Sequence, residues 1–464
     1  MARGIYPAVM LIFLLVPLGL VRGQEVAQHP HAAIARTLLE KGMRSMGAMT
    51  YLERLTSIGH RLAGSKEASL AVEETKRMME EMGLDNIHLE AVEVSHWERG
   101  PQEEARIMGG DPLSVCALGG SVATPAGGLV AEVIEVCSLE ECDSLGEKAK
   151  GRIVFFNRPM DPTLVNTFNA YGGAADQRVH GAARAAAQGA VAVLVRSLTL
   201  RHDDVPHTGI MRYDDKFTKI PAAALGLISA DQLHTALSQG PVSVHLAMGC
   251  KMHKPVVSHN VVGQLTGIEK PDEIIALGGH LDSWDQGTGA HDDGAGCMQS
   301  IEALRLLKEA GLLPKRTIRV VMFMDEEFGG VGGRGYAADP IRKTEHHVAA
   351  IESDRGGFLP LGFTVNAPEE LIPAYRKYLV LFEPMGMFFI KKGFGGVDIR
   401  PLEDSGTVTI GLYPDSQRYF DVHHSANDVI SSVNKRELEI GAVAMAVFAY
   451  ALAQDGVPVV QETD

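Results

Sequence analysis

Residues 273–327 alternate between apolar strands and an amphipathic helix. They read EIIALGGHLD at 273–282, GAGCMQSIEALRLLKEAG at 294–311 and RTIRVVMFMDEE at 316–327. Near-continuous apolar strands that alternate with helices are typical of a sheet covered by helices on both faces. The same alternation continues with a predicted strand at 346–354 and predicted helices at 368–386 and 437–454. We therefore predict an α/β/α sandwich around a mixed, largely parallel sheet.

The N-terminal half has a different texture. Helical spacing of apolar residues runs from about 30 to 83, and a predicted strand follows at 85–97. From about residue 111 the pattern changes to short β-rich pieces with one predicted helix at 175–189. We predict that this block is a β-rich insertion. The expected division is a signal peptide at 1–23, an N-terminal part of the main domain at 24–112, the insertion at 113–258 and the remainder at 259–464.

Composition excludes several functions. The chain has 464 residues, of which 45% are hydrophobic and 22% charged, so a large core is available. Its net charge of −15 argues against binding nucleic acid through a broad basic face. Five scattered cysteines without a CxxC motif do not form a disulfide framework or a cysteine-bound zinc site. Cys137 and Cys142 are close enough in sequence to form a disulfide, and this pairing stays open.

The first 23 residues have the pattern of a secretory signal. Arg3 precedes an apolar run from Pro7 to Val21, and Gly23 offers a small residue for cleavage. The run is shorter than the roughly 20 apolar residues that a membrane span needs, although an uncleaved anchor is the alternative. We expect an exported protein, secreted or periplasmic, with no membrane contact after the signal is removed.

Polar residues cluster where the predicted strands of the second half end. These residues are His280, Asp282, Asp292, Asp293, Asp325, Glu326, Glu327, Glu352, Asp354, His423 and His424. In open α/β sheets, ligands bind beyond the carboxyl ends of the strands. Carboxylates mixed with imidazoles suit zinc. The residues form five clusters, and one ligand from each cluster suffices for two ions that share one carboxylate. The alternative is that these are helix caps and solvated surface groups.

The adjacent Glu326 and Glu327 predict two roles. At the junction of a strand and a turn, both side chains can face one cleft from different angles. One carboxylate can then bind a metal while the other acts as a general base, because a carboxylate beside a metal site is well placed to accept the proton of an activated water.

The motif order H-x-D, D-D-G-x-G, E-E-x-G, E-S-D and H-H-S resembles the co-catalytic zinc peptidases of the aminopeptidase S and glutamate carboxypeptidase family. Longer stretches extend the resemblance over essentially the whole mature chain: GHLDSWDQGTGAHDDGAG at 279–296, PKRTIRVVMF at 314–323, EEFGGVG at 326–332, PHTGI at 206–210 and HWERG at 96–100. In this family the middle block resembles a protease-associated domain inserted into the peptidase domain. The sequence departs from close relatives in the loop 391–401, where Phe394 and Val397 replace polar residues, so the substrate side-chain preference stays open.

The resemblance implies a role for each candidate residue and two zinc ions per chain. By resemblance, one zinc is bound by His280 and Asp354, the other by Glu327 and His424, and both by a bridging Asp292. Glu326 is then the general base, and Asp282 orients a ligand imidazole. Asp293 corresponds to the paired aspartate whose peptide bond with the bridging residue is cis. A homodimer is also expected from the resemblance.

The predicted function is a zinc-dependent exopeptidase that hydrolyses dipeptides or removes N-terminal residues from short peptides. The expected attack is by a water held between the two metals, with Glu326 taking its proton. Two alternatives come from other classes: a glutaminyl cyclase-like acyltransferase, which needs one zinc, and a non-catalytic peptidase-like receptor, which typically lacks metal ligands. Metal stoichiometry and turnover of a simple dipeptide discriminate among the three.

Overall fold

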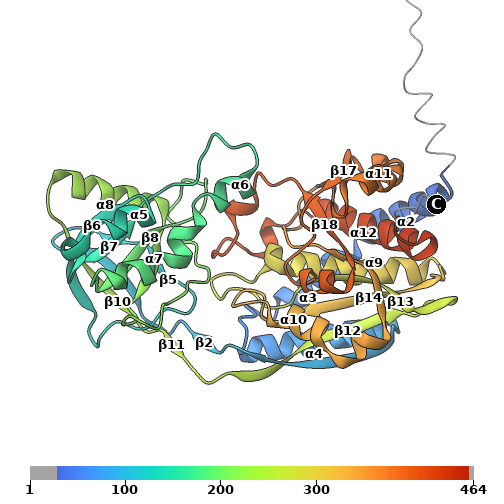
Figure 1. The fold of residues 1–464 in the computed structure, drawn as a ribbon, viewed down its shortest axis with the longest axis horizontal. Coiled ribbons are helices and arrows are strands. Elements are labelled where there is room, and N and C mark those ends of the chain that lie inside the picture. The colour runs from blue at the N-terminus through green and yellow to red at the C-terminus, as the bar shows by residue number, and fades with distance from the viewer. Residues whose placement is uncertain (1–28, 459–464) are drawn as a thin grey trace, which may run out of the picture.

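The structure is a computed structural model that describes residues 29–458 (Figure 1). The predicted signal peptide at 1–23 lies outside the described residues. Two groups of strands and helices lie side by side along the long axis of the molecule, each built around its own sheet. All five cysteines are free thiols, so Cys137 and Cys142 do not form a disulfide here.

The larger group contains an eight-stranded mixed sheet. Its spatial order is β1-β12-β14-β13-β15-β18-β16-β17, and its four central strands run parallel. The strands are β1 (Asp85–Val94), β12 (Val256–Leu265), β13 (Lys270–His280), β14 (Arg316–Phe323), β15 (His346–Glu352), β16 (Pro360–Asn366), β17 (Phe389–Lys392) and β18 (Val408–Pro414). The segment from Ile274 to Leu277 in β13 is buried on both sides, which explains its unbroken apolar sequence.

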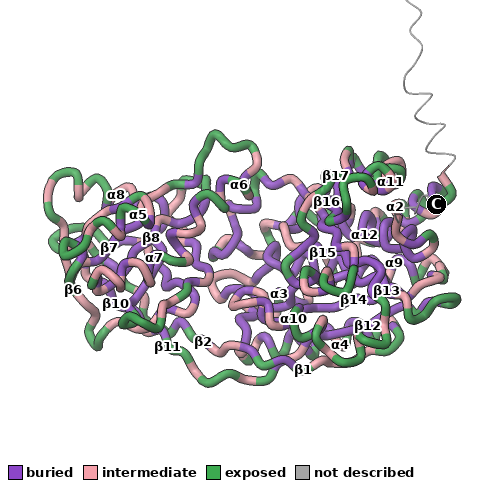
Figure 2. The backbone as a smooth tube through the Cα atoms, in the orientation of Figure 1, coloured by how far each residue is buried: buried purple, intermediate pink, exposed green. Residues whose placement is uncertain are grey.

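Helices cover both faces of this sheet, as predicted. One face carries α2 (Ala32–Ser45), α3 (Gly47–Thr56), α4 (Lys66–Met82), α9 (Ala295–Glu309) and α12 (Lys435–Asp455). The other face carries α10 (Val331–Ala338) and a 3-10 turn, η7 (Arg400–Ser405). Among the described residues, only α12 is long and apolar enough to cross a membrane, and most of it is buried in the core (Figure 2). The predicted sandwich is confirmed.

The smaller group is built on a second eight-stranded sheet. Its order is β4-β3-β10-β6-β7-β8-β9-β5, and β6 to β9 run parallel. The strands are β3 (Glu103–Ile107), β4 (Pro112–Leu113), β5 (Val115–Ala117), β6 (Leu129–Val136), β7 (Ile153–Phe156), β8 (Ala192–Arg196), β9 (Ala222–Leu225) and β10 (Ser243–Met248). We call this second group the inserted unit. Its strands span 103–248, whereas the sequence places the insertion at 113–258; that domain division stays a prediction.

Helices also cover the inserted unit. Helices α5 (Leu139–Asp143) and α7 (Ala175–Ala187) pack on one face, and α8 (Leu227–Gln239) packs on the other. A short helix, α6 (Thr167–Gly172), lies toward the larger group (Figure 1). Four helices therefore stand where the sequence predicts one. Helix α8 escapes prediction because small and polar residues dilute its apolar face.

Two strand pairs connect the units. Strands β1 and β12, which flank the insertion in the sequence, pair antiparallel in the main sheet. Beyond them, β2 (Trp97–Glu98) pairs with β11 (Lys251–Met252) as a separate two-stranded ribbon. The chain thus enters and leaves the inserted unit at one place, where β2 and β11 lie at the connection between the two units (Figure 1).

One predicted helix is wrong. The segment 368–386 is not a continuous helix but a short helix, α11 (Ile372–Arg376), with 3-10 turns on both sides. Pro373 lies at the first turn of α11, where its missing N–H costs nothing, but it prevents the helix from extending backward. Pro384 similarly starts a separate 3-10 turn.

Candidate metal centre

The predicted polar residues meet at the carboxyl ends of the central parallel strands. His280 is the last residue of β13, the segment 325–327 follows β14, and Asp354 follows β15. Asp292 lies in the turn before α9, and His424 lies in the loop after β18. Gly296 lets α9 approach these strand ends, because a Cβ there would lie 1.7 Å from the carbonyl oxygen of Ser353.

Asp292 stands between two histidine-containing groups. Its Oδ1 lies 3.3 Å from His280 Nε2, which is also 3.6 Å from Asp354 Oδ1. Its Oδ2 lies 3.3 Å from His424 Nε2, which is 3.1 Å from Glu327 Oε2. One buried carboxylate therefore joins the five residues that the sequence nominated as ligands.

His423 also approaches the centre, although it was not assigned as a ligand. Its ring stacks on that of His424 with centroids 3.6 Å apart, and its Nε2 lies 3.7 Å from Asp292 Oδ2. Ligand atoms of Asp292, His423 and His424 all lie within 4.8 Å of one another, as do those of His280, Asp292 and Asp354. The two groups share only Asp292.

The donor set fits a divalent cation. Asp292 Oδ2 and Glu327 Oε1 are buried and have no hydrogen-bond partner among the described residues, which is costly unless a cation satisfies them. Burial lowers the pKa of His424 to about 3, so its imidazole is neutral and can act as a ligand. Imidazole and carboxylate without thiolate suit zinc and similar ions.

Comparison with known proteins shows the family to which this chain belongs. A sequence model described as Peptidase family M28 matches residues 260–449. Carboxypeptidase Q of Mus musculus is 35% identical over 402 residues, which cover 86% of this chain and 83% of that protein. Carboxypeptidase Q of Homo sapiens is 34% identical over 429 residues, covering 90% and 89%. The chain belongs to peptidase family M28.

Solved M28 structures agree. A peptidase M28 precursor from Shewanella amazonensis is 32% identical, covers 96% of this chain and 100% of its own, and superposes with a TM-score of 0.88. A zinc aminopeptidase from Bacillus subtilis, 20% identical with a TM-score of 0.65, shares the fold; the match covers 89% of this chain and 96% of that one. The predicted activity class is confirmed: the protein is a metallo-exopeptidase. Neither the acyltransferase nor the receptor alternative is favoured.

In this M28 chain, Asp282 fixes the segment that carries Glu326 and Glu327. Its Oδ1 accepts hydrogen bonds from the backbone N–H groups of Asp325 and Glu326 at 2.8 and 3.1 Å, and its Oδ2 accepts one from Glu327 at 3.2 Å. His280 Nδ1 lies 3.1 Å from the backbone oxygen of Asp282 and 3.7 Å from its carboxylate. The carboxylate is therefore engaged mainly with the backbone of 325–327, while the imidazole meets the Asp282 carbonyl.

Asp293 and Asp428 fix the turn that carries Asp292. The Asp292–Asp293 peptide bond is cis, as the resemblance implies. Asp293 accepts hydrogen bonds from the backbone N–H groups of His280 and Gly296, each at 3.1 Å. Asp428 accepts bonds from His291 N–H at 2.7 Å and Asp292 N–H at 3.0 Å. Asp428 lies four residues after His424, and no sequence pattern assigns it this role.

A cavity of about 360 Å³ opens over the centre, lined by both units. The larger group contributes Glu326, Phe328, Val397 and Phe420, and the inserted unit contributes Phe168, Tyr171, Arg178, Ile210 and Arg212. Glu326 is half-buried at this wall. Burial raises its pKa well above the usual range; the charges of Asp354 and Glu327 raise it further, while that of His280 opposes the shift.

Glu352 shapes one wall of the cavity. Its carboxylate accepts hydrogen bonds from the backbone N–H groups of Val397, Asp398 and Ile399 at 2.8 to 3.1 Å. This contact holds Val397 at the cavity, in the loop where the sequence departs from its relatives. Phe394 from the same loop is exposed and does not line the cavity.

Two further residues support the ligands but were not predicted. Trp284 donates its indole N–H to Glu327 Oε2 at 2.5 Å. Thr208, from the inserted unit, contacts His424 through its backbone in both directions. Trp284 and Thr208 occur in stretches that carry the family resemblance, yet no local pattern shows what either contacts.

Proposed function

We propose that this protein is a two-zinc exopeptidase that hydrolyses dipeptides or removes N-terminal residues from short peptides. The observation that carries the proposal is the position of Asp292 between two histidine groups. His280 and Asp354 would hold one zinc, Glu327 and His424 would hold the other, and Asp292 would be shared by both sets of ligands. Bound zinc would supply Lewis-acid polarisation of the scissile carbonyl and would lower the pKa of water.

Glu326 is the proton-transfer group of the proposed reaction. It lines the cavity beside the ligand set but is not one of the five ligands. Its carboxylate accepts the proton of the attacking water and returns it to the leaving amine. Asp282 keeps Glu326 in place through the backbone of 325–327. Such a positioned base typically contributes about 10²–10⁴-fold to the rate.

Charges at the cavity support a short substrate with free ends. The carboxylates of the cavity can hold a protonated α-amino group, whereas Arg178 and Arg212 of the inserted unit bring positive charge to the same cavity. The inserted unit covers the cavity as a protease-associated domain would and limits the length of peptide that fits. The same proposal includes export by the 1–23 signal and assembly as a homodimer.

Metal analysis and turnover test the proposal together. The purified mature protein should contain at least two zinc ions per chain, lose dipeptide hydrolysis after treatment with a strong chelator, and regain it with zinc. Fully active protein with one metal or none would refute the two-zinc assignment. Metal-loaded protein that hydrolyses no dipeptide in a library would refute the exopeptidase substrate class.

A further inference from the structure

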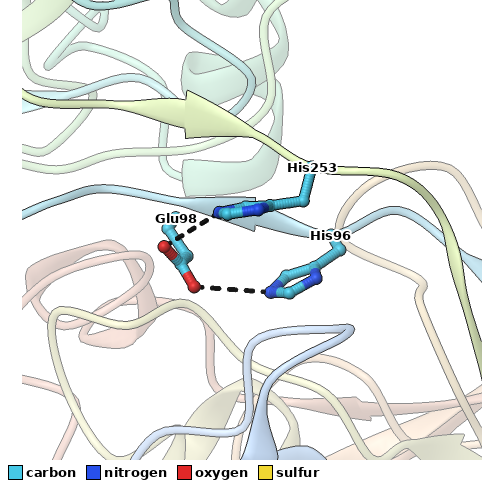
Figure 3. A group of neighbouring side chains, drawn as sticks. All are labelled: His96, Glu98 and His253. Carbon is cyan, nitrogen blue, oxygen red and sulfur yellow. Dashed lines mark ion pairs between the residues drawn. The ribbon is translucent and has the colours of Figure 1, made fainter.

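A second cluster of side chains that can bind a metal ion lies on the two-stranded ribbon that joins the two units. His96 precedes β2, Glu98 lies in it, and His253 follows β11 (Figure 3). His253 Nε2 lies 2.9 Å from Glu98 Oε2, and His96 Nε2 lies 3.5 Å from Glu98 Oε1. One ligand atom from each residue lies within 4.8 Å of the others. None of the three lines the catalytic cavity.

The ribbon register explains why these side chains converge. Trp97 pairs with Met252 and Glu98 with Lys251, so His96 and His253 stand opposite one another at the next position. The backbone N–H of His253 donates to the oxygen of His96 at 2.8 Å, which confirms this pairing. Glu98 lies two residues after His96 and therefore on the same face. Figure 3 shows both imidazoles directed toward the Glu98 carboxylate.

We propose that His96, Glu98 and His253 bind a divalent cation of the zinc class, separate from the catalytic centre. Two imidazoles and one carboxylate form a ligand set that such ions prefer, with water completing the coordination. The His96 and His253 side chains are 24% and 25% exposed, so solvent can reach the site. His253 Nε2 is buried and has no well-directed hydrogen bond despite its nearness to Glu98, which leaves its lone pair available.

A cation at this position would connect the two chain segments that run between the units. His96 and His253 belong to the two chain segments that enter and leave the inserted unit, so one ion would clip the two crossings together. On the opposite face, Trp97 is buried and packs near Phe328, which lines the catalytic cavity. Next to it, Arg99 pairs with Asp285 at 2.6 Å in the larger group. Fixing the ribbon would therefore steady both units around the cavity.

The test compares zinc content among full-length variants. Protein stripped with chelator is equilibrated with a fixed excess of Zn²⁺, and bound zinc is counted by elemental analysis after equilibrium dialysis. His253→Gln and His96→Gln should each bind one equivalent less than wild type. His234→Gln is the matched control, because His234 also lies 2.9 Å from a carboxylate, that of Glu135, but belongs to no such group among residues 29–458.

A second readout separates binding from a fault in folding. Added Zn²⁺ should raise the Tm of wild type and His234→Gln by more than that of His253→Gln, since a bound ion stabilises only the folded state. Equal zinc content in wild type and both ribbon variants would overturn the proposal and leave a simple His–Glu ion pair. The one-equivalent difference does not depend on how many ions the catalytic centre holds, so this result is independent of the proposed reaction.

Discussion

Thr208 of the inserted unit and His424 of the larger group contact one another through two hydrogen-bonding pairs of atoms. The backbone N–H of Thr208 donates to the His424 oxygen at 2.9 Å, and the Thr208 oxygen lies 3.3 Å from His424 Nδ1. An Nδ1–H that donates to this carbonyl fixes the tautomer, so that Nε2 presents its lone pair toward Asp292 and Glu327. The inserted unit therefore contacts the candidate metal centre through the backbone of Thr208.

Gly209→Ala tests this contact. Gly209 has φ +131°, and an added Cβ would lie 2.5 Å from Arg178 Nη1 and 2.6 Å from His424 Nδ1. We expect zinc affinity or kcat/KM to fall by roughly 10–100-fold, the usual loss when a partner of a ligand imidazole is disturbed. Gly151→Ala is the control, because Gly151 also has positive φ but no atom would lie within 4 Å of its Cβ. Equal losses in both variants would assign the effect to backbone strain.

Glu326→Gln should keep the metals and the fold but lower kcat by about 10²–10⁴-fold, because an amide cannot accept the proton of water. Asp292→Asn should differ by also losing bound zinc, since it removes the charge shared by both groups. Elemental analysis and stopped dipeptide assays on the same preparations compare the two. A near-normal kcat in Glu326→Gln would require another base.

The recognised end of the substrate can be read from three compounds. A dipeptide with free ends is compared with its N-acetyl form and its C-terminal amide, and kcat/KM is measured for each. We expect acetylation to cause the larger loss, because it removes the positive charge that the cavity carboxylates would hold. If amidation costs more, the carboxylate is the recognised end of the substrate, and Arg178 and Arg212 of the cavity would be the groups that hold it.

Glu439 should make the protein progressively less stable as the pH rises from about 4.5 to about 8. Burial raises its pKa to about 8, and the nearby charge of Glu302 adds to the shift. The folded state then keeps a proton that the unfolded state loses above about pH 4.5, so the free energy of unfolding should fall as pH rises from about 4.5 to about 8. Glu439→Gln should show a smaller loss of Tm than wild type over this range. Glu309→Gln, at a side chain 51% exposed, should behave as wild type.

The sequence predicted the strands and helices whose pattern of apolar residues matches the faces that are buried in the fold. Strand β13 and helices α9 and α12 are buried on most sides, so their apolar runs are long and unambiguous. The segment 368–386 failed because helical spacing of apolar residues outweighed Pro373 and Pro384. The candidate ligands could be nominated from the sequence because they follow predicted strands, and ligands bind at strand ends in such sheets.

Contacts between distant segments could not be predicted. Nothing near Thr208 in the sequence shows that its backbone meets His424, and nothing near Asp428 shows that it fixes the turn at Asp292. The expectation for Asp282 illustrates the same limit. The resemblance implies that Asp282 orients the imidazole of His280, and its carboxylate lies 3.7 Å from His280 Nδ1. The same carboxylate also accepts hydrogen bonds from the three backbone N–H groups of 325–327, which the sequence does not show.

The pairing of β1 with β12 means that the main sheet does not need the inserted unit for its strand order, although His424 contacts that unit. Because these two strands are hydrogen-bonded neighbours, the chain between them has the position of a long hairpin loop in the main sheet. Its two ends are held together by the strand pairing itself. A short turn could bridge the same gap without breaking the main sheet. Such a shortened chain would nevertheless lack Thr208, and His424 would be free to adopt the other tautomer. The main sheet thus closes without the inserted unit, whereas the tautomer of His424 depends on it.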